Sequence, residues 1–222
     1  MDNTTHALVA DGAAIYSGAD GGFNMKAEQA VSQVNLVQAG GEGGKLAISG
    51  SVAYNGITSD TLAQLGAGAF VTGRDVRLYA GDLETNVNWV GGIAKGETTG
   101  VGIAVAINNL NRQTQAIIGD ADQLTSNNSI DAVQHINVSG DVKLRAFVGG
   151  ELWSFAVAGA AATGSQPEQP EVGKAPAGAS KTPSQFDSTI APQQSGSTTA
   201  AAAAVSVNIV NDDTRAAIVD AG

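Results

Sequence analysis

The chain has 222 residues, of which 43% are hydrophobic, so it can bury a core as one elongated domain or as two small globular ones. Its formal charge of −10 argues against binding to a nucleic-acid backbone or to an anionic membrane surface. The chain has no run of about 18 apolar residues and no cysteine, which argues against membrane insertion, a disulfide framework and thiolate metal sites.

The composition favours thin layers of strands over a bulky globular centre. Aromatic residues make up only 5% of the chain, and 29 residues are glycine. A core with so few aromatic rings has to be filled by Val, Ile, Leu and Ala, which suits closely stacked β-strands.

A Thr-x-Ala-x-(Ile/Leu/Val) phrase recurs along the chain. It begins at Thr5, Thr61, Thr114 and Thr214, at intervals of 56, 53 and 100 residues. Recurrence along a Gly-rich chain predicts stacked repeats, each of which buries its apolar edge against its neighbours. The first copy follows directly after a start that lacks the basic and apolar regions of a signal peptide, and the last copy ends with the chain. We therefore expect residues 1–222 to be a single β-solenoid fragment of a longer repeat array.

Each repeat is predicted to contain four kinds of strand in a fixed order. The first alternates large apolar with small side chains, as in residues 46–54 and 101–107, and the Thr-x-Ala strand comes second. An Asp-Val-Lys-Leu strand and a strand bearing Trp89 or Trp153 complete the repeat. The alternation has a period of two, which indicates half-buried strands. We expect several coils of about 20 residues per repeat, with strands of about five residues.

Asn-rich breaks separate the first strand of each repeat from the second. Asn adopts the left-handed backbone at low cost, so we expect turns at these positions. The breaks are Asn55-Gly56, Asn108-Asn109 and Asn211-Asp212.

The first strand of each repeat also has a uniformly small face, as at Ala104 and Ala106 or at Ala204, Ser206 and Asn208. A wall of small side chains lets another layer approach closely, and that layer can be an insertion, a second sheet or a neighbouring molecule. We expect self-association of the chain through these small-residue faces as one consequence.

The long last interval contains an insertion. All five prolines lie within residues 164–199, a segment rich in Gln, Ser, Ala and Gly without strand alternation. We predict a flexible Pro/Gln/Ser-rich loop there. A repeat stack tolerates such a loop because its closure cost grows only logarithmically with length.

Candidate catalytic or metal-binding residues are few, and none is assigned as a site. His6 and His135 are isolated and are expected to face solvent. Asp120, Asp122 and Asp131 could form a carboxylate cluster, but Asp recurs once per repeat, which is typical of a turn-former. Catalytic, metal and cofactor-binding residues are therefore predicted to be absent, and no cofactor is expected.

Three further groups have structural interpretations. The run at residues 40–45 resembles the start of a calcium-binding nonapeptide, but Lys45 replaces the ligand Asp, so a flexible Gly turn is expected. Lys26, Arg77 and Lys143 are expected on an exposed strand face. Trp89 and Trp153 are expected in core or edge packing, with a sugar-stacking platform as the alternative. The chain contains no other tryptophan.

Three phrases, at residues 102–109, 114–120 and 140–146, resemble the repeats of giant secreted bacterial adhesins, which are filamentous-haemagglutinin-like or leukotoxin-type proteins. The resemblance covers most of the chain outside residues 164–199. It implies a right-handed parallel β-helix, exported across the outer membrane to the bacterial cell surface or secreted, with a role in cell adhesion and virulence. The partner it implies is a receptor or glycan on a host or neighbouring cell.

Two function classes remain as hypotheses. The first is a non-enzymatic structural or adhesive segment that provides a rigid stalk and a binding surface. The alternative is a carbohydrate-active β-helix enzyme, a polysaccharide lyase or depolymerase, whose acidic residues would stack on successive coils. A β-sandwich adhesin module is the alternative fold, because alternation alone does not distinguish parallel from antiparallel strands.

Overall fold

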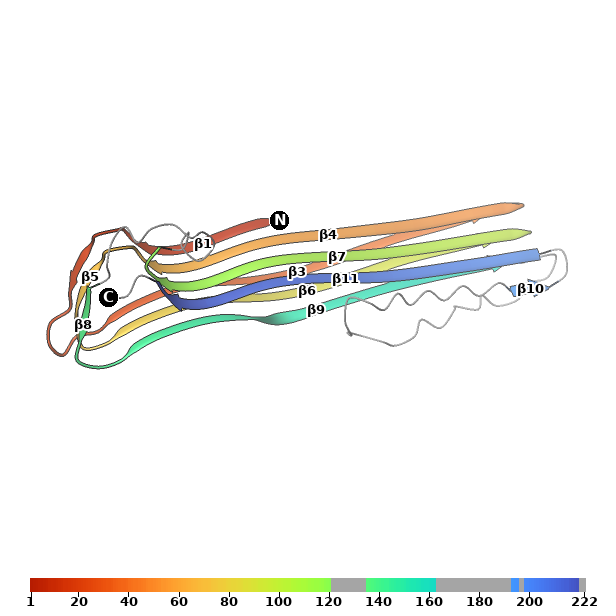
Figure 1. Ribbon diagram of the computed structural model, residues 1–222. Coiled ribbons are helices and arrows are strands. Elements are labelled where there is room, and N and C mark those ends of the chain that lie inside the picture. Colours follow the sequence, from red (N-terminus) through yellow and green to blue (C-terminus); the bar gives the residue numbers. More distant parts are fainter. Residues whose placement is uncertain (121–134, 163–192, 196–197, 220–222) are drawn as a thin grey trace.

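The computed structural model describes residues 1–120, 135–162, 193–195 and 198–219, and in these ranges it is an all-β structure without helix (Figure 1). No helix in the described ranges is long and apolar enough to span a lipid bilayer. The strands are β1 (Asp2–Val9), β2 (Ala14–Tyr16), β3 (Phe23–Gly43), β4 (Leu46–Leu65), β5 (Phe70–Gly73), β6 (Val76–Gly96), β7 (Thr99–Ile118), β8 (His135–Val138), β9 (Val142–Ala162), β10 (Gln193–Ser195) and β11 (Thr198–Ile218).

The strands form three sheets. Sheet A has the order β1-β4-β7-β11-β10, sheet B the order β2-β5-β8, and sheet C the order β3-β6-β9. The chain passes from a strand of sheet A to one of sheet B, then to one of sheet C, and then begins the next coil. All pairings between described strands are parallel except the short antiparallel pair of β10 with β11. The fold is therefore a parallel β-solenoid as predicted, and the β-sandwich alternative is wrong.

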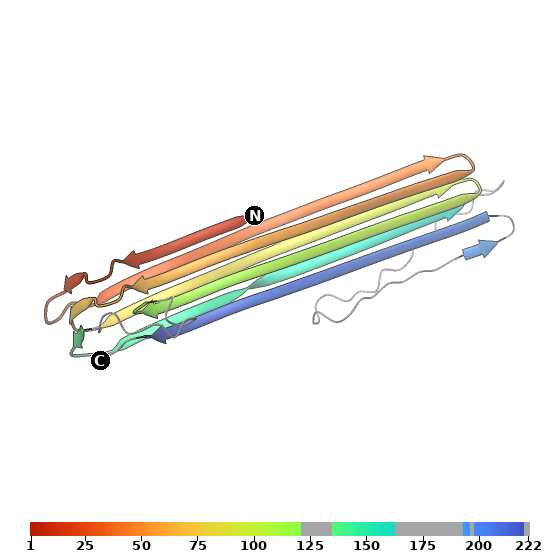
Figure 2. The ribbon, with the colours of Figure 1, turned by 45° about the horizontal axis from the view of Figure 1, so that its top comes forward.

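The coils are much larger than predicted. β4, β6, β7 and β9 have 20 or 21 residues each, and one coil takes up a whole repeat. Strands of this length extend about 65–70 Å. They lie side by side along a flat blade, with sheet B at one end, called here the corner end, and two-residue turns at the other, called here the turn end (Figure 2). The prediction of 20-residue coils with five-residue strands is wrong because the four predicted strands fuse in pairs into two long ones.

The predicted Asn turns are also wrong. Asn55 and Asn108 lie inside continuous strands, in register with each other and with Asn208, and they are buried between sheets A and C. The amide of Asn108 accepts from Asn88 Nδ2 at 3.0 Å and donates to Asn208 Oδ1 at 2.8 Å. These bonds satisfy the Asn108 amide, so the backbone there stays extended where an isolated Asn would favour a turn. Asn55 Nδ2 has no hydrogen-bond partner among the described residues.

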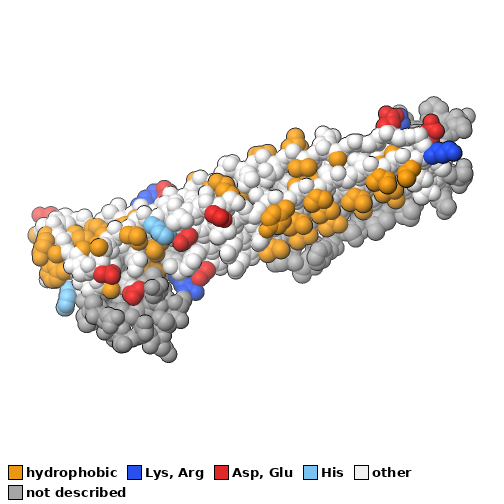
Figure 3. Space-filling model, turned by 90° about the horizontal axis from the view of Figure 1, so that it is seen from above, with side chains coloured by type: hydrophobic (Ala, Val, Ile, Leu, Met, Phe, Trp, Pro, Cys, Tyr) orange, Lys and Arg blue, Asp and Glu red, His pale blue; other side chains and the backbone are white. Residues whose placement is uncertain are grey.

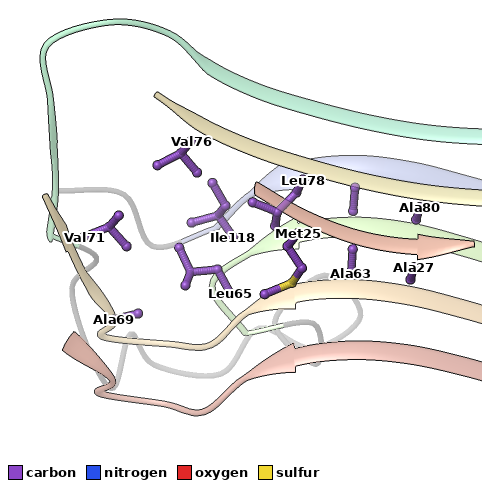
Figure 4. Close-up of a cluster of buried hydrophobic side chains, with 11 residues drawn as sticks. Met25, Ala27, Ala63, Leu65, Ala69, Val71, Val76, Leu78, Ala80 and Ile118 are labelled. Atoms are coloured by element: carbon purple, nitrogen blue, oxygen red, sulfur yellow. The ribbon is translucent and has the colours of Figure 1, made fainter. Parts of the chain in front are cut away.

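The Thr-x-Ala phrase is one structural position repeated on successive coils. Thr5, Thr61, Thr114 and Thr214 pair in register in sheet A. The Ala and branched residues of the phrase face inward, where they form the core of the corner end together with side chains of sheets B and C (Figure 4). The members of this core are Met25, Ala27, Ala63, Leu65, Ala69, Val71, Val76, Leu78, Ala80, Ala116 and Ile118.

Toward the turn end the two large sheets come close together. A Cβ on Gly92 would lie 2.3 Å from the carbonyl oxygen of Ile103, and one on Gly102 would lie 2.1 Å from that of Gly159. Only small side chains fit between sheets at such a distance. The small faces predicted from the sequence therefore face inward, as buried Ala104 and Ala106 do, and the layer that they admit is sheet C. The large branched side chains of the same strands face outward.

The predicted insertion lies between β9 and β11, two strands on successive coils. In earlier coils the same connection has two residues, Gly44 and Lys45 or Glu97 and Thr98. Residues 163–192, most of the predicted loop, lie outside the described residues. β11 begins at Thr198, inside the predicted limits of 164–199.

Candidate functional site

The isolated histidines face solvent as predicted. His6 is on the outer face of sheet A, where its Nε2 lies 3.0 Å from Asp60 Oδ2 on β4. His135 is exposed at the start of β8, and its ring centroid lies 6.5 Å from that of Phe70. Neither arrangement brings a second histidine or a cysteine to the ring.

Two of the three candidate aspartates, Asp122 and Asp131, lie outside the described residues. Asp120 lies two residues after the end of β7. Asp11, the corresponding residue of the first repeat, accepts a hydrogen bond from the backbone N–H of Ala67 at 2.8 Å and thus links the corners of two coils. In the described part of the chain no group of three or more His, Cys, Asp or Glu is placed to hold a metal ion.

The predicted basic residues lie on exposed strand faces. Each has a carboxylate partner two residues away: Lys26 pairs with Glu28, Arg77 with Asp75 and Lys143 with Asp141. Arg77 and Lys143 occupy equivalent positions in sheet C. Lys26 is shifted by two residues, because its register partner is Tyr79, over whose ring its ammonium lies at 5.4 Å.

Sequence reasoning missed a band of polar side chains between sheets A and C. On β6 four successive inward positions are Asp82, Glu84, Asn86 and Asn88, and all four are buried. Period-two alternation, continued from Val76 through this strand, puts these four on the inward face. The signal was therefore present in the sequence, but it conflicts with the rule that charged residues stay outside.

One part of this polar band is a chain of hydrogen bonds that connects two successive coils. Thr5 Oγ1 donates to Gln29 Oε1 at 3.1 Å, and Gln29 Nε2 donates to Ser59 Oγ at 2.9 Å. Ser59 Oγ then donates to Asp82 Oδ2 at 2.5 Å. A carboxylate that accepts such a bond is partly compensated for its loss of water.

A second part of the band is a partly buried ion pair. Arg112 of β7 donates from Nε to Asp212 Oδ1 at 2.7 Å and from Nη2 to Asp212 Oδ2 at 2.8 Å. Its Nη1 donates to the carbonyl oxygen of Gly149 at 3.0 Å. The Arg112 side chain is 8% exposed and that of Asp212 is 32% exposed. This fork geometry connects β7, β9 and β11 by charge-assisted bonds.

Glu84 lies next to this pair. Burial raises the pKa of its carboxyl, with Asp82 and Asp212 adding to the increase, while the nearby Arg112 opposes it. Neither carboxyl oxygen of Glu84 has a hydrogen-bond partner among the described residues. The arrangement favours the neutral acid inside the blade. Because Asp82 and Glu84 are enclosed between two sheets, their carboxyl groups offer no approach for a substrate.

Aromatic side chains form a group on the outer face of sheet C. Trp89 and Trp153 are 49% and 40% exposed, so the expectation of core or edge packing is wrong. Phe155 lies between them, with ring centroids 5.4 Å from Trp89 and 6.1 Å from Trp153. Trp153 Nε1 donates to Glu151 Oε2 at 3.0 Å, which fixes one indole beside a carboxylate. We call Trp89, Trp153 and Phe155 the aromatic group.

A shallow groove of about 350 Å³ lies at the corner end, beside Gly18, Thr72 and Asn137. The residues that line it carry no ionisable side chain. The groove thus supplies no group for acid or base chemistry.

Comparisons with protein-family models, with curated proteins and with solved structures found no match to the chain.

Proposed function

We propose that this chain is a non-enzymatic structural and adhesive segment of a large bacterial cell-surface or secreted protein. The observation that carries the proposal is the distribution of side chains. Large apolar and aromatic side chains lie on the outer faces, whereas the two buried carboxylates, Asp82 and Glu84, lie enclosed in the polar band. Such a distribution suits contact with another surface better than turnover of a substrate.

The mechanical part of the proposal depends on the strand ladders. Six long strands of sheets A and C form four parallel pairings, each over 20 or 21 successive residues. Parallel ladders of this length make each coil a template for the next, so that the stack resists bending and local opening. The repeat resemblance to giant secreted adhesins adds the setting of an exported stalk.

The adhesive part depends on the aromatic group. Two half-exposed indoles at fixed separation present flat apolar faces, and Glu151 beside Trp153 supplies a hydrogen-bond acceptor. Flat rings next to polar groups are suited to the apolar faces and hydroxyls of sugars. A glycan or glycosylated receptor on a neighbouring cell is the partner that this chemistry fits.

The test is binding of the labelled chain to a glycan array and to intact cells. Trp89→Ala and Trp153→Ala should each weaken binding at least about 10-fold, since central aromatic contacts dominate such interfaces. Tyr54→Ala, which removes an exposed ring from sheet A, is the matched control and should leave binding unchanged. Equal binding by all four proteins would rule out the aromatic group as the contact.

The enzymatic alternative is tested separately. Incubation with acidic polysaccharides and Ca²⁺ should give no unsaturated products. Their accumulation, at a rate proportional to protein concentration, would replace the adhesive proposal with a lyase.

A further inference from the structure

One half of the outer face of sheet A is unusually apolar. The turn-end halves of its three long strands, residues 46–57, 99–110 and 199–210, contain no charged residue. Figure 3 shows hydrophobic side chains gathered over this half of the blade, with charged groups toward the corner end and at the tip of the turn end. We call its outward side chains the apolar face: Leu46, Ile48, Val52, Tyr54, Val101, Ile103, Val105, Ile107, Ala201, Ala203, Val205, Val207 and Ile209.

The side chains of this face are exposed to a degree that is rare for their type. Leu46 is 56% exposed, Ile48 and Val52 are each 66% exposed, and Tyr54 is 65% exposed. They are outside because the space between the sheets beside Gly92 and Gly102 is too narrow for large side chains. Contiguous apolar surfaces of this kind on soluble proteins usually mark a contact with another molecule.

The apolar face is also flat. Parallel pairing in register places equivalent side chains next to each other, so that Val52, Val105 and Val205 form one row across three strands. Tyr54 and Ile107 form part of the next row. Rows of branched side chains at equal height are the surface with which one β-sheet packs on another, at about 10 Å separation.

The area is sufficient for a stable contact. Three strands at about 4.8 Å spacing and twelve residues at about 3.3 Å each give a flat footprint of about 14 by 40 Å, or about 560 Å². Two such faces together remove about 1,100 Å² from water, above the about 1,000 Å² that a biological interface needs. Charged residues at the margin, Asp60, Asp213 and Arg215, would form the polar rim.

We propose that the apolar face packs against the same face of a second copy of this chain, in a two-fold symmetric dimer. An uncharged, flat and aliphatic surface is complementary to itself and not to a charged partner. The aromatic group of sheet C is less suited to this contact, because its rings are tilted by 38° between Trp89 and Phe155. It stays free on the opposite side of each copy. The dimer goes beyond the adhesive function, which does not require it.

The first experiment is sedimentation equilibrium on the whole chain between about 1 and 100 µM. The unmodified chain should be a dimer, and Ile103→Lys should raise its dissociation constant at least about 100-fold, because each copy would bury a charge against its mate. Gln113→Lys is the matched control. It lies on the same strand and the same outer face, beyond the apolar rows, and should leave the dimer intact.

Two results would overturn the proposal. The first is a monomeric unmodified chain at 100 µM, and the second is a dimer that Ile103→Lys and Gln113→Lys leave equally stable. A dimer broken by Trp89→Lys, with Ile103→Lys still dimeric, would assign the contact to sheet C and overturn it as well.

A second measurement is independent of any effect of lysine on folding. The chain has no cysteine, so single substitutions report their own surroundings. Val105→Cys, near the centre of the apolar face, should form a covalent dimer with a short bis-maleimide. Thr85→Cys, exposed on sheet C, should stay monomeric under the same conditions. The reverse result would refute the proposed face.

Discussion

The partly buried ion pair between Arg112 and Asp212 allows the sharpest test of the interior. We predict that Asp212→Asn, which keeps the shape of the side chain but removes its charge, destabilises the fold by about 2–3 kcal/mol. Opposite charges about 4 Å apart attract by about 4 kcal/mol at an effective dielectric of 20. The partial exposure of Asp212, 32%, lowers that value, whereas the 8% exposure of Arg112 means that its charge would be left almost without water.

The neighbouring residue provides the matched control. Asp213 faces outward, and its Oδ1 accepts from Arg215 Nε at 2.8 Å, with side chains 42% and 39% exposed. Asp213→Asn removes the same charge from a pair of the same chemistry on the same strand. We expect a loss within about 0.5 kcal/mol, because exposed ion pairs contribute little.

The assay is urea unfolding followed by tryptophan fluorescence and far-ultraviolet circular dichroism. Asp212→Asn should lower the midpoint without changing the dependence on urea. The double variant Arg112→Met/Asp212→Leu should recover most of the loss, since an apolar pair of similar volume leaves no buried charge. Equal losses from Asp212→Asn and Asp213→Asn would refute the assignment of a special role to burial.

Three further predictions concern the rest of the interior. Burial raises the pKa of Glu84, so its stabilising effect is complete below the ordinary glutamate pKa and is lost as pH rises through the folded pKa. The urea midpoint of the unmodified chain should therefore fall between pH 4 and 8, and Glu84→Gln, which does not ionise, should reduce this fall. Gly102→Val should cost about 3 kcal/mol by forcing the sheets apart, whereas Gly50→Ala, where a Cβ meets nothing closer than 3.9 Å, should change the melting temperature little. Asn108→Ala should cost about 2 kcal/mol by breaking the amide stack, and Asn109→Ala on the outer face less than about 0.5 kcal/mol, both measured by urea unfolding.

The sequence was sufficient to predict which residues of the Thr-x-Ala phrase stack on one another, although it misplaced Lys26 in sheet C by two residues. The Thr-x-Ala phrase recurs because Thr61 and Thr114 occupy the same position on successive coils, and side chains stacked in this way need similar volumes. A parallel solenoid follows from that recurrence. The length of a coil did not follow, because Asn108 has the local preferences of a turn residue, and only its partners Asn88 and Asn208 keep it in a strand.

The outer faces and the polar band were harder to predict. Alternation distinguishes two faces of a strand but does not say which one is buried. Hydrophobicity favours Ile48 inside, yet Gly92 and Gly102 allow the facing backbone so close that only small side chains fit. Asp82 and Glu84 occupy inward positions by periodicity, but their burial depends on partners contributed by other coils, such as Ser59. The exposure of Trp89 is a consequence of the same thin interior.

The equal register of successive coils has an implication for how such a chain can change over generations. Leu46 of β4 pairs with Thr99 of β7, and Val76 of β6 pairs with Val142 of β9, so adjacent coils are interchangeable along the stacking axis. Duplication or deletion of a stretch that spans one whole coil would restore the same contacts at the new junction. Recombination between copies can therefore change the length of the stack by whole coils, without any substitution at the contacts that bind one coil to the next.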